Sequence, residues 1–159
     1  MSISQGDAVP DVTVQMMNDG RPGPVSLRDL TAGKKVVLFA VPGAFTPTCS
    51  LQHLPGFVDK ADEIKAKGVD EIICTAVNDA FVMDAWGKSA SADAISMVAD
   101  GNGELASALG LEMDGSGFGL GTRSQRYAMV IDDGVITKLA VEAPGQFEVS
   151  SAEAILADL

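Results

Sequence analysis

Short apolar runs, separated by polar or glycine-containing segments, recur along the chain and predict its strands. In residues 34–42 two lysines are followed by a continuous apolar run. The branched side chains of this run predict a central strand buried on both faces. The run at 69–79 has the same character and predicts a second buried strand. The alternation over 12–16 predicts a first strand, and the short run at 95–100 predicts another.

Apolar residues spaced three or four positions apart predict helices between these strands. Residues 54–68 carry such a stripe, with charged side chains between the apolar ones and a glycine at the end. Further helices are predicted at 79–90, 102–111 and 150–159. A helix that begins upstream of Pro55 should be kinked or split there, because proline lacks an N–H group and its ring collides with the preceding turn.

The remaining segments complete the predicted architecture. Residues 126–142 contain two β-rich runs joined by Asp-Asp-Gly, which predicts a hairpin. Segments 21–27 and 112–125, rich in proline or glycine, are predicted to be loops. The order of elements predicts an α/β fold, a mixed central β-sheet flanked by helices on both faces. The thioredoxin-like fold has this layout, and residues 1–159 are predicted to form a single domain.

The acidity of the chain bears on its partners and its location. It has 22 acidic against 11 basic residues, a formal net charge of -11. Nucleic acids and anionic membranes require a basic patch, so no nucleic acid and no membrane is expected as a partner. The N-terminal residues resemble no secretory signal or transit peptide, and no apolar run approaches the roughly 20 residues that span a bilayer, so a cytoplasmic protein is expected. In that compartment the two cysteines are not expected to form a permanent disulfide.

The first cysteine, Cys49, lies where a reactive thiolate can be stabilised. If the strand 34–42 ends at Pro42 and a helix begins near Thr46, Cys49 falls in the first turn of that helix, at the carboxyl edge of the sheet. A free thiol, with a pKa of about 8.5, is mostly protonated at neutral pH, but unpaired N–H groups and the helix dipole favour an anion. Thr46 is a natural N-cap whose hydroxyl could also orient a substrate O–H group, and Pro42 would shield the sulfur from water. The dipole contributes only about 1 kcal/mol, so a second cation is needed.

Other interpretations of the candidate residues stay open. Free cysteine is often a small buried hydrophobe, so Cys49 could be inert, as could Cys74 inside the predicted strand 69–79. His53 follows Cys49 by four residues and is interpreted as a packing or capping residue rather than a catalytic base. The cysteines and this histidine lie in different elements without zinc-finger spacing, so no metal and no cofactor is predicted. Disulfide exchange is disfavoured because no Cys-x-x-Cys motif is present, and a non-enzymatic binding protein is the third class.

The stretch PGAFTPTC, from Pro42 to Cys49, resembles the active-site pattern of the peroxiredoxins. In that pattern a proline, three residues, a threonine or serine and two further residues precede the peroxidatic cysteine. Two more blocks, at 77–87 and 123–134, resemble the type-II peroxiredoxins. The likeness extends over nearly the whole chain, which makes it far more specific than the short pattern alone.

This resemblance implies a mechanism. Cys49 would attack a hydroperoxide as a thiolate and become a sulfenic acid. Arg126 would be the supporting cation, by its place just before the strand that starts at Tyr127, and Arg123 is its rival. Thr46 and the Cys49 N–H group would align the two peroxide oxygens, and Pro42 would complete the site.

The resemblance also implies the partners. Hydrogen peroxide and organic hydroperoxides would be the substrates, and glutathione with glutaredoxin, or thioredoxin, the reductant. A homodimer with an interface near the active site is expected. Phe45, Phe81 and Trp86 flank the predicted site, where they would pack in the core or serve this interface. In some type-II peroxiredoxins a cysteine in the strand of Cys74 has been treated as a candidate resolving partner, but a disulfide needs Cα atoms within about 7 Å, which a mid-strand thiol would reach only after local unfolding. We therefore expect a one-cysteine cycle, in which an external thiol reduces the sulfenic acid.

Overall fold

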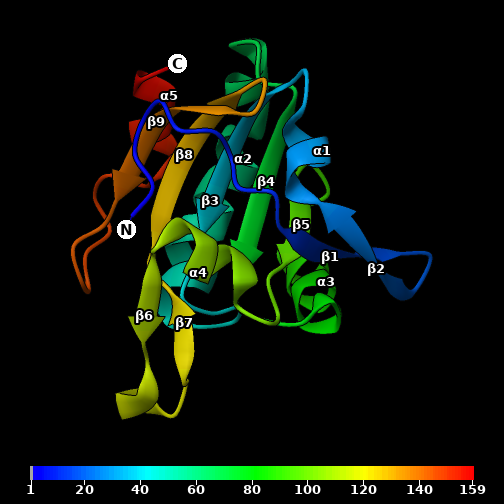
Figure 1. The fold of residues 1–159 in the computed structure, drawn as a ribbon, viewed down its shortest axis with the longest axis vertical. Coiled ribbons are helices and arrows are strands. Elements are labelled where there is room, and N and C mark those ends of the chain that lie inside the picture. The colour runs from blue at the N-terminus through cyan, green and yellow to red at the C-terminus, as the bar shows by residue number, and fades with distance from the viewer. Residues whose placement is uncertain (1) are drawn as a thin grey trace.

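Seven strands form one mixed sheet at the centre of the molecule (Figure 1). The computed structural model describes residues 2–159. The strand order is β2-β1-β5-β4-β3-β8-β9, in which β3, β4 and β5 are parallel and the other neighbours pair antiparallel. The strands are β1 (Thr13–Asn18), β2 (Arg21–Ser26), β3 (Lys35–Ala40), β4 (Glu71–Ala76), β5 (Ser96–Ala99), β8 (Tyr127–Asp132) and β9 (Val135–Val141).

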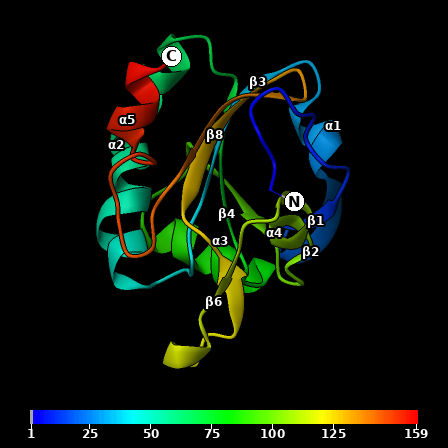
Figure 2. The same cartoon turned by 60° about the vertical axis from the view of Figure 1, so that its left-hand side comes forward.

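Helices cover both faces of this sheet (Figure 2). One face packs against α2 (Leu54–Ala66), α3 (Ala80–Ser89) and α5 (Ala152–Ala157). The other packs against α1 (Leu27–Thr31) and α4 (Glu104–Leu109). The predicted thioredoxin-like α/β fold, with a mixed central sheet between helices, is confirmed.

Strand β3 shows how the apolar run at 34–42 serves both faces. Successive side chains of a strand point to opposite sides, so Val37 and Phe39 enter the core beneath α2 and α3. Val36 and Leu38 enter the second core, beneath α1 and α4. Both neighbours of β3, the parallel β4 and the antiparallel β8, are also sheet-interior strands. The chain therefore leaves β3 at the middle of the sheet, where the loop that carries Cys49 begins.

The prediction of a loop at 21–27 is wrong. Residues Arg21–Ser26 form β2, which pairs antiparallel with β1 along its whole length, and α1 follows at once. The two prolines of this segment, Pro22 and Pro24, are tolerated because β2 is an edge strand, where a residue without an N–H group need not bond a second neighbour.

The prediction of a loop at 112–125 is also wrong. Strands β6 (Glu112–Asp114) and β7 (Thr122–Ser124) pair antiparallel and project from the body as a separate hairpin (Figure 1). A single 3-10 turn at Ser116–Phe118 forms its tip. Gly119 and Gly121 have positive φ angles there, which explains the glycine richness that suggested a loop.

The prediction of a hairpin at 126–142 is confirmed by β8 and β9, which pair antiparallel. Asp133 and Gly134 both have positive φ angles, 47° and 78°, as a two-residue type I′ turn requires. This hairpin places Arg126 immediately before β8, beside the end of β3 where Ala40 pairs with Tyr127.

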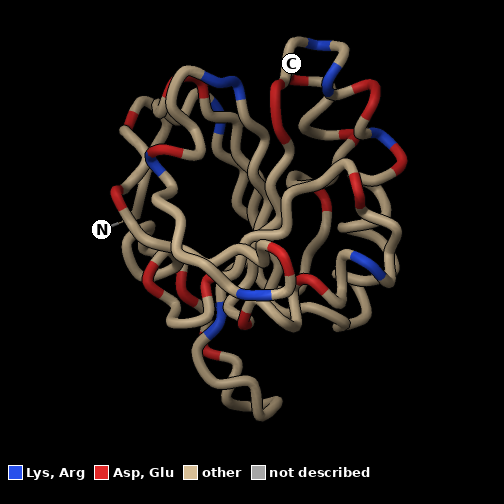
Figure 3. Tube along the Cα trace, turned by 90° about the vertical axis from the view of Figure 1, so that its right-hand side faces the viewer, with Lys and Arg blue, Asp and Glu red and all other residues tan. Residues whose placement is uncertain are grey.

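The acidic residues are distributed around the whole fold rather than gathered in one patch (Figure 3). Among residues 2–159, no helix combines the length and the apolar character that a bilayer crossing requires.

Candidate active site

Cys49 lies in the segment that connects β3 to α2. The loop after β3 is fixed by backbone bonds, since the Val41 N–H donates to the Thr75 carbonyl at the end of β4. It is also fixed by a side chain, because Asn78 accepts the Ala44 N–H through its Oδ1 at 3.0 Å. Both partners belong to the carboxyl end of β4, so the loop lies at the edge of the sheet where open α/β folds place their sites.

The helix that carries Cys49 begins with an unusually wide turn. Helical residues start at Pro47, and Cys49–His53 form a π-helix in which the Leu54 N–H donates to the Cys49 carbonyl. Regular α2 begins at Leu54, with Pro55 in its first turn. The predicted alternative of a split at Pro55 is wrong, because helical residues run without a break from Pro47 to Ala66 and the helix only changes from π-helical to α-helical at Leu54. The wide turn precedes the proline, which has no N–H group of its own to donate.

The predicted side-chain cap by Thr46 is wrong. Its backbone carbonyl does accept the first helical bond, from Ser50 N–H at 2.8 Å. Its hydroxyl, however, donates to the Gly43 carbonyl at 2.7 Å, because the tight turn before the helix brings that carbonyl within reach. The hydroxyl proton is thereby engaged, and the oxygen keeps its lone pairs to accept a hydrogen bond.

Arg126, and not Arg123, reaches the sulfur. The Arg126 guanidinium donates from Nη2 to Cys49 Sγ at 3.1 Å and from Nη1 to His53 Nδ1 at 2.8 Å. Its third neighbour is the ring of Phe147, whose centroid lies 5.7 Å from Cζ.

Arg123 has a different function in the structure. It donates from Nε to the Leu120 carbonyl at 3.0 Å and from Nη1 to the Pro42 carbonyl at 3.4 Å. It therefore fastens the β6–β7 hairpin to the loop that precedes Cys49. Gly43 is suited to this close approach, because a Cβ there would lie 3.0 Å from the Arg123 Nη1.

His53 is fully buried and contacts Arg126 at Nη1, the guanidinium nitrogen that does not contact the sulfur. Its Nε2 lies 2.9 Å from the Ser150 carbonyl, which can only accept, so Nε2 carries the proton and Nδ1 is free to accept from Arg126. Burial, and then the charge of Arg126, lower the pKa of His53 to about 3, so the ring is neutral at physiological pH. The rings of Phe39, Phe57 and Phe147 surround it at centroid distances of 4.9, 5.6 and 4.9 Å.

Sequence reasoning interpreted His53 as packing and missed its contact with Arg126. Its spacing from Cys49 carries a signal, because residues four apart share a helix face and the same guanidinium can contact both.

Glu142 is a second residue that sequence reasoning missed. This buried carboxylate accepts four hydrogen bonds at one oxygen, Oε2. Its donors are the N–H groups of Glu148, Val149 and Ser150 and the Ser150 hydroxyl, at 2.7–2.9 Å. Burial raises the pKa of this carboxyl, but the bonds from Ser150, Glu148 and Val149 outweigh it, and the net pKa is lowered.

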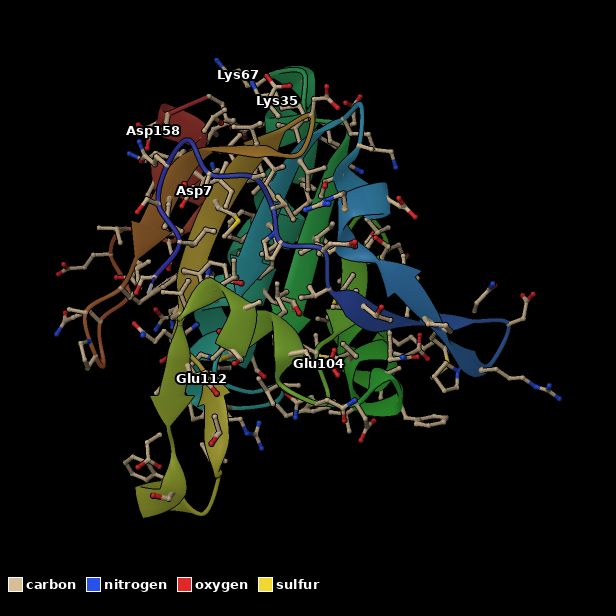
Figure 4. The ribbon with its side chains drawn as sticks, viewed as in Figure 1. Asp7, Lys35, Lys67, Glu104, Glu112 and Asp158 are labelled. Atoms are coloured by element: carbon tan, nitrogen blue, oxygen red, sulfur yellow. The ribbon has the colours of Figure 1, made fainter. Side chains whose placement is uncertain are left out.

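A cavity of ≈ 490 Å³ opens beside the guanidinium. Pro42, Thr48 and Arg126 line one side of it. It is also lined by residues of the projecting hairpin, including Met113, Phe118 and Glu112 at the base of β6 (Figure 4), and by residues 142–146. Cys49 has no solvent-exposed surface, so in this conformation its sulfur lies beneath the cavity, behind Arg126.

Cys74 lies in the middle of β4, where it pairs with Phe39 of β3 and Met97 of β5. It is fully buried and, like Cys49, is a free thiol. Burial, and then the proximity of Cys49, raise the pKa of the Cys74 thiol well above its ordinary value. A thiol in this environment is protonated and a poor nucleophile.

Known proteins resemble this chain over nearly its whole length, both in sequence and in structure. The family model described as Redoxin matches residues 4–156. Peroxiredoxin-2B of Arabidopsis thaliana is 53% identical over 156 residues, covering 97% of this chain and 96% of the relative. Peroxiredoxin sll1621 of Synechocystis is 43% identical, covering 96% of this chain and 89% of its own. The crystal structure of reduced Prx3 from Vibrio vulnificus in complex with H2O2 is 58% identical, covers 98% of both chains and superposes with a TM-score of 0.95.

Replacing Arg126 by alanine should make Cys49 a weaker nucleophile at neutral pH, because the substitution removes the cation that donates to the sulfur. We expect the rate of alkylation by iodoacetamide to fall by about tenfold or more, the factor that corresponds to about 1.4 kcal/mol. The thiolate absorbance in the ultraviolet, measured in a Cys74→Ser background, should fall in parallel. Arg123→Ala is the matched control and should lower the alkylation rate much less. Equal losses in the two variants would contradict the assignment of Arg126.

The stability of the protein should fall as the pH is lowered from about 6.5 towards 3. In that range the unfolded chain binds a proton at His53 that the folded protein does not, because the folded pKa is depressed. The slope of the free energy of unfolding should approach about 1.4 kcal/mol per pH unit, and this contribution should be constant above about pH 6.5. Urea unfolding at a series of pH values measures it. His53→Gln should flatten the slope above about pH 5, where most carboxylates stay ionised, and an unchanged slope would refute the depressed pKa.

Proposed function

The chain belongs to the peroxiredoxins of the redoxin family, and on that premise we propose that Cys49 is the residue with which this thiol-dependent peroxidase attacks its substrate. The resemblance to type-II peroxiredoxins is confirmed by the full-length matches. The observation that carries the proposal is the 3.1 Å contact between the Arg126 guanidinium and the Cys49 sulfur. A guanidinium stays protonated at any physiological pH, so it stabilises a thiolate at that position.

In the proposed reaction the Cys49 thiolate attacks the terminal oxygen of a hydroperoxide. An S–O bond forms and the O–O bond breaks, so that the sulfur becomes a sulfenic acid and the rest of the peroxide leaves as hydroxide or alkoxide. The leaving oxygen then takes a proton from water, giving water or an alcohol. The developing charge would lie beside Arg126, whose bonds to Cys49 and His53 fix its position, and the guanidinium would stabilise that charge in the transition state. Thr46, with its hydroxyl proton engaged by Gly43, would accept from the peroxide O–H group.

The cavity beside Arg126 supports organic hydroperoxides as substrates in addition to hydrogen peroxide. Its walls include the apolar side chains of Met113, Phe118 and Pro144, which could contact an alkyl group. Arg126 and Pro42 form the side of the cavity that is nearest the sulfur. A peroxide would approach the sulfur from this side with its reactive oxygens towards the guanidinium.

We propose that an external thiol completes the cycle. The thiol attacks the sulfenic sulfur, water leaves, and a mixed disulfide forms on Cys49; a second thiol then releases the reduced enzyme and a disulfide product. Glutathione with glutaredoxin, or thioredoxin, supplies these electrons. Burial and the raised pKa of Cys74 support a cycle that does not use it. The cytoplasmic location stays a prediction.

Replacing Cys49 by serine should abolish peroxide consumption, whereas Cys74→Ser should retain turnover with at least one reductant. The assay is NADPH-coupled turnover with either the thioredoxin or the glutathione–glutaredoxin system. Intact mass after stoichiometric hydrogen peroxide should show one added oxygen, in the wild type and in Cys74→Ser but not in Cys49→Ser.

Two outcomes of these assays would contradict the proposal in different ways. Unmodified thiols under excess peroxide would show that Cys49 is not peroxidatic. Loss of turnover with every reductant in Cys74→Ser, while Cys49 is still oxidised, would show that the one-cysteine cycle is wrong.

We also propose that the protein is a homodimer, joined through an apolar surface beside the site. Phe45, Leu51 and Phe81 are 55%, 76% and 59% exposed, which is high for large apolar side chains. Contacts beneath them connect their elements: Ala44 N–H bonds to Asn78, and the Trp86 indole bonds to Ser50. The ring of Phe45 also lies 6.4 Å from that of Trp86. The three exposed side chains therefore lie on elements that contact one another, and a second copy would cover them.

Replacing Phe81 by glutamate should weaken the dimer, because it would place a charge in the proposed interface. Val135→Glu, which puts the same charge at an exposed side-chain position of β9, is the control and should not weaken the dimer. Sedimentation velocity over a range of concentrations measures both. A wild-type protein that is monomeric at the highest concentration would refute the proposal.

A further inference from the structure

We propose that Glu142 is a positioning residue for peroxide reduction, acting on Arg126 through the segment 147–150 and His53. This inference rests on the proposed function, in which Arg126 stabilises the Cys49 thiolate. Glu142 touches neither the sulfur nor the Arg126 guanidinium. Three successive hydrogen bonds connect it to the guanidinium, through Ser150 and His53, and a fourth connects the guanidinium to the sulfur.

The first contact is made by the carboxylate itself. Glu142 gathers the N–H groups of three consecutive residues, Glu148 to Ser150, on a single oxygen and adds the Ser150 hydroxyl. None of the ion pairs among residues 2–159 involves Glu142, so these donors alone satisfy the charged oxygen. Hydrogen bonds to a charged acceptor are about twice as strong as neutral ones. The segment before α5 is therefore held in one conformation by one side chain.

The second contact links this segment to His53. The carbonyl of Ser150, whose N–H and hydroxyl are held by Glu142, accepts from His53 Nε2 at 2.9 Å. This bond fixes both the ring orientation and the tautomer that presents an unprotonated Nδ1 to Arg126. Phe147, three residues earlier in the same segment, packs against both the His53 ring and the guanidinium.

The third contact of the chain is the bond from Arg126 Nη1 to His53 Nδ1, and the backbone of Glu142 adds a direct connection to Arg126. The Glu142 N–H donates to the Arg126 carbonyl at 2.9 Å, at the open end of the β8–β9 hairpin. Arg126 is thus tied to Glu142 twice, by its backbone directly and by its side chain through His53 and Ser150. The closed circuit leaves the guanidinium little freedom, so that one amino group faces His53 and the other faces the sulfur.

This circuit predicts what loss of the carboxylate would do. Without it, three N–H groups lose their acceptor, the Ser150 carbonyl is released, and His53 is free to turn. The guanidinium would then populate orientations that do not donate to Cys49. Displacement of a catalytic group by about 1 Å can cost on the order of 100-fold in rate.

The test compares three variants of the full-length enzyme. Glu142→Ala should lower the second-order rate constant of Cys49 with hydrogen peroxide by about 10-fold to 100-fold, and should lower the thiolate absorbance at neutral pH with it. Glu142→Gln keeps an acceptor oxygen without the charge and should show a smaller loss. Glu148→Ala is the control: it removes an exposed carboxylate of the same segment but keeps the N–H group that Glu142 binds, and should react like the wild type.

A double-mutant cycle with His53→Ala separates positioning from general destabilisation. If Glu142 acts through His53, then Glu142→Ala should cause little further loss of rate once His53 is replaced. Fully additive losses, or a Glu142→Ala enzyme of wild-type rate and thiolate absorbance with only a lowered melting temperature, would overturn the proposal. If the alanine variant does not fold, a wild-type rate in Glu142→Gln overturns it. Whether hydrogen peroxide oxidises Cys49 in the wild type tests the proposed function, and that test does not depend on any of these outcomes.

Discussion

The hydrogen bond from Arg126 to the Cys49 sulfur is the interaction on which the site depends, and most of the surrounding structure serves to hold its donor. A guanidinium has many accessible orientations, and burial of a charge is costly unless its bonds are satisfied. Here a neutral histidine accepts one amino group, the sulfur accepts the other, and an aromatic ring lies alongside. The histidine can accept only because burial prevents its protonation and a carbonyl fixes its tautomer. The buried core beneath α2 is therefore part of the chemistry as well as of the stability.

Sequence patterns predicted those parts of the fold that are determined by burial. The continuous apolar run at 34–42 forms an interior strand of the sheet. Its side chains point to both faces, and each face is covered by a core of apolar residues. The segments at 21–27 and 112–125 were missed because backbone pairing, and not side-chain burial, makes them strands: at a sheet edge for β2 and in a separate hairpin for β6 and β7. Proline and glycine lower the intrinsic preference for strand, and local pairing with a neighbouring strand overrides it.

The site was predictable as far as it is encoded locally. Pro42, Thr46 and Cys49 lie close together in the chain, so their spacing is visible in the sequence. Arg126 lies in a block of sequence that resembles the type-II peroxiredoxins, and its place there predicts its role. The Thr46 cap failed because the competing Gly43 carbonyl is visible only in the folded turn. The roles of His53 and Glu142 could not be derived, since the bond that connects His53 to Ser150 spans 97 positions of the chain and forms only when α5 packs against α2.

The two edges of the sheet affect whether the protein aggregates at high concentration. An unpaired strand edge is a template onto which another molecule can add a strand, the first step of aggregation. On β2 the prolines remove donors from that template. On β9 the N-terminal segment covers part of the edge, through the bonds of Gly6 and Val9 to Ile136 and Gly134. Intermolecular sheet growth is thus discouraged at both margins, whereas the apolar surface beside the active site, where a second copy is proposed to bind, carries no such protection.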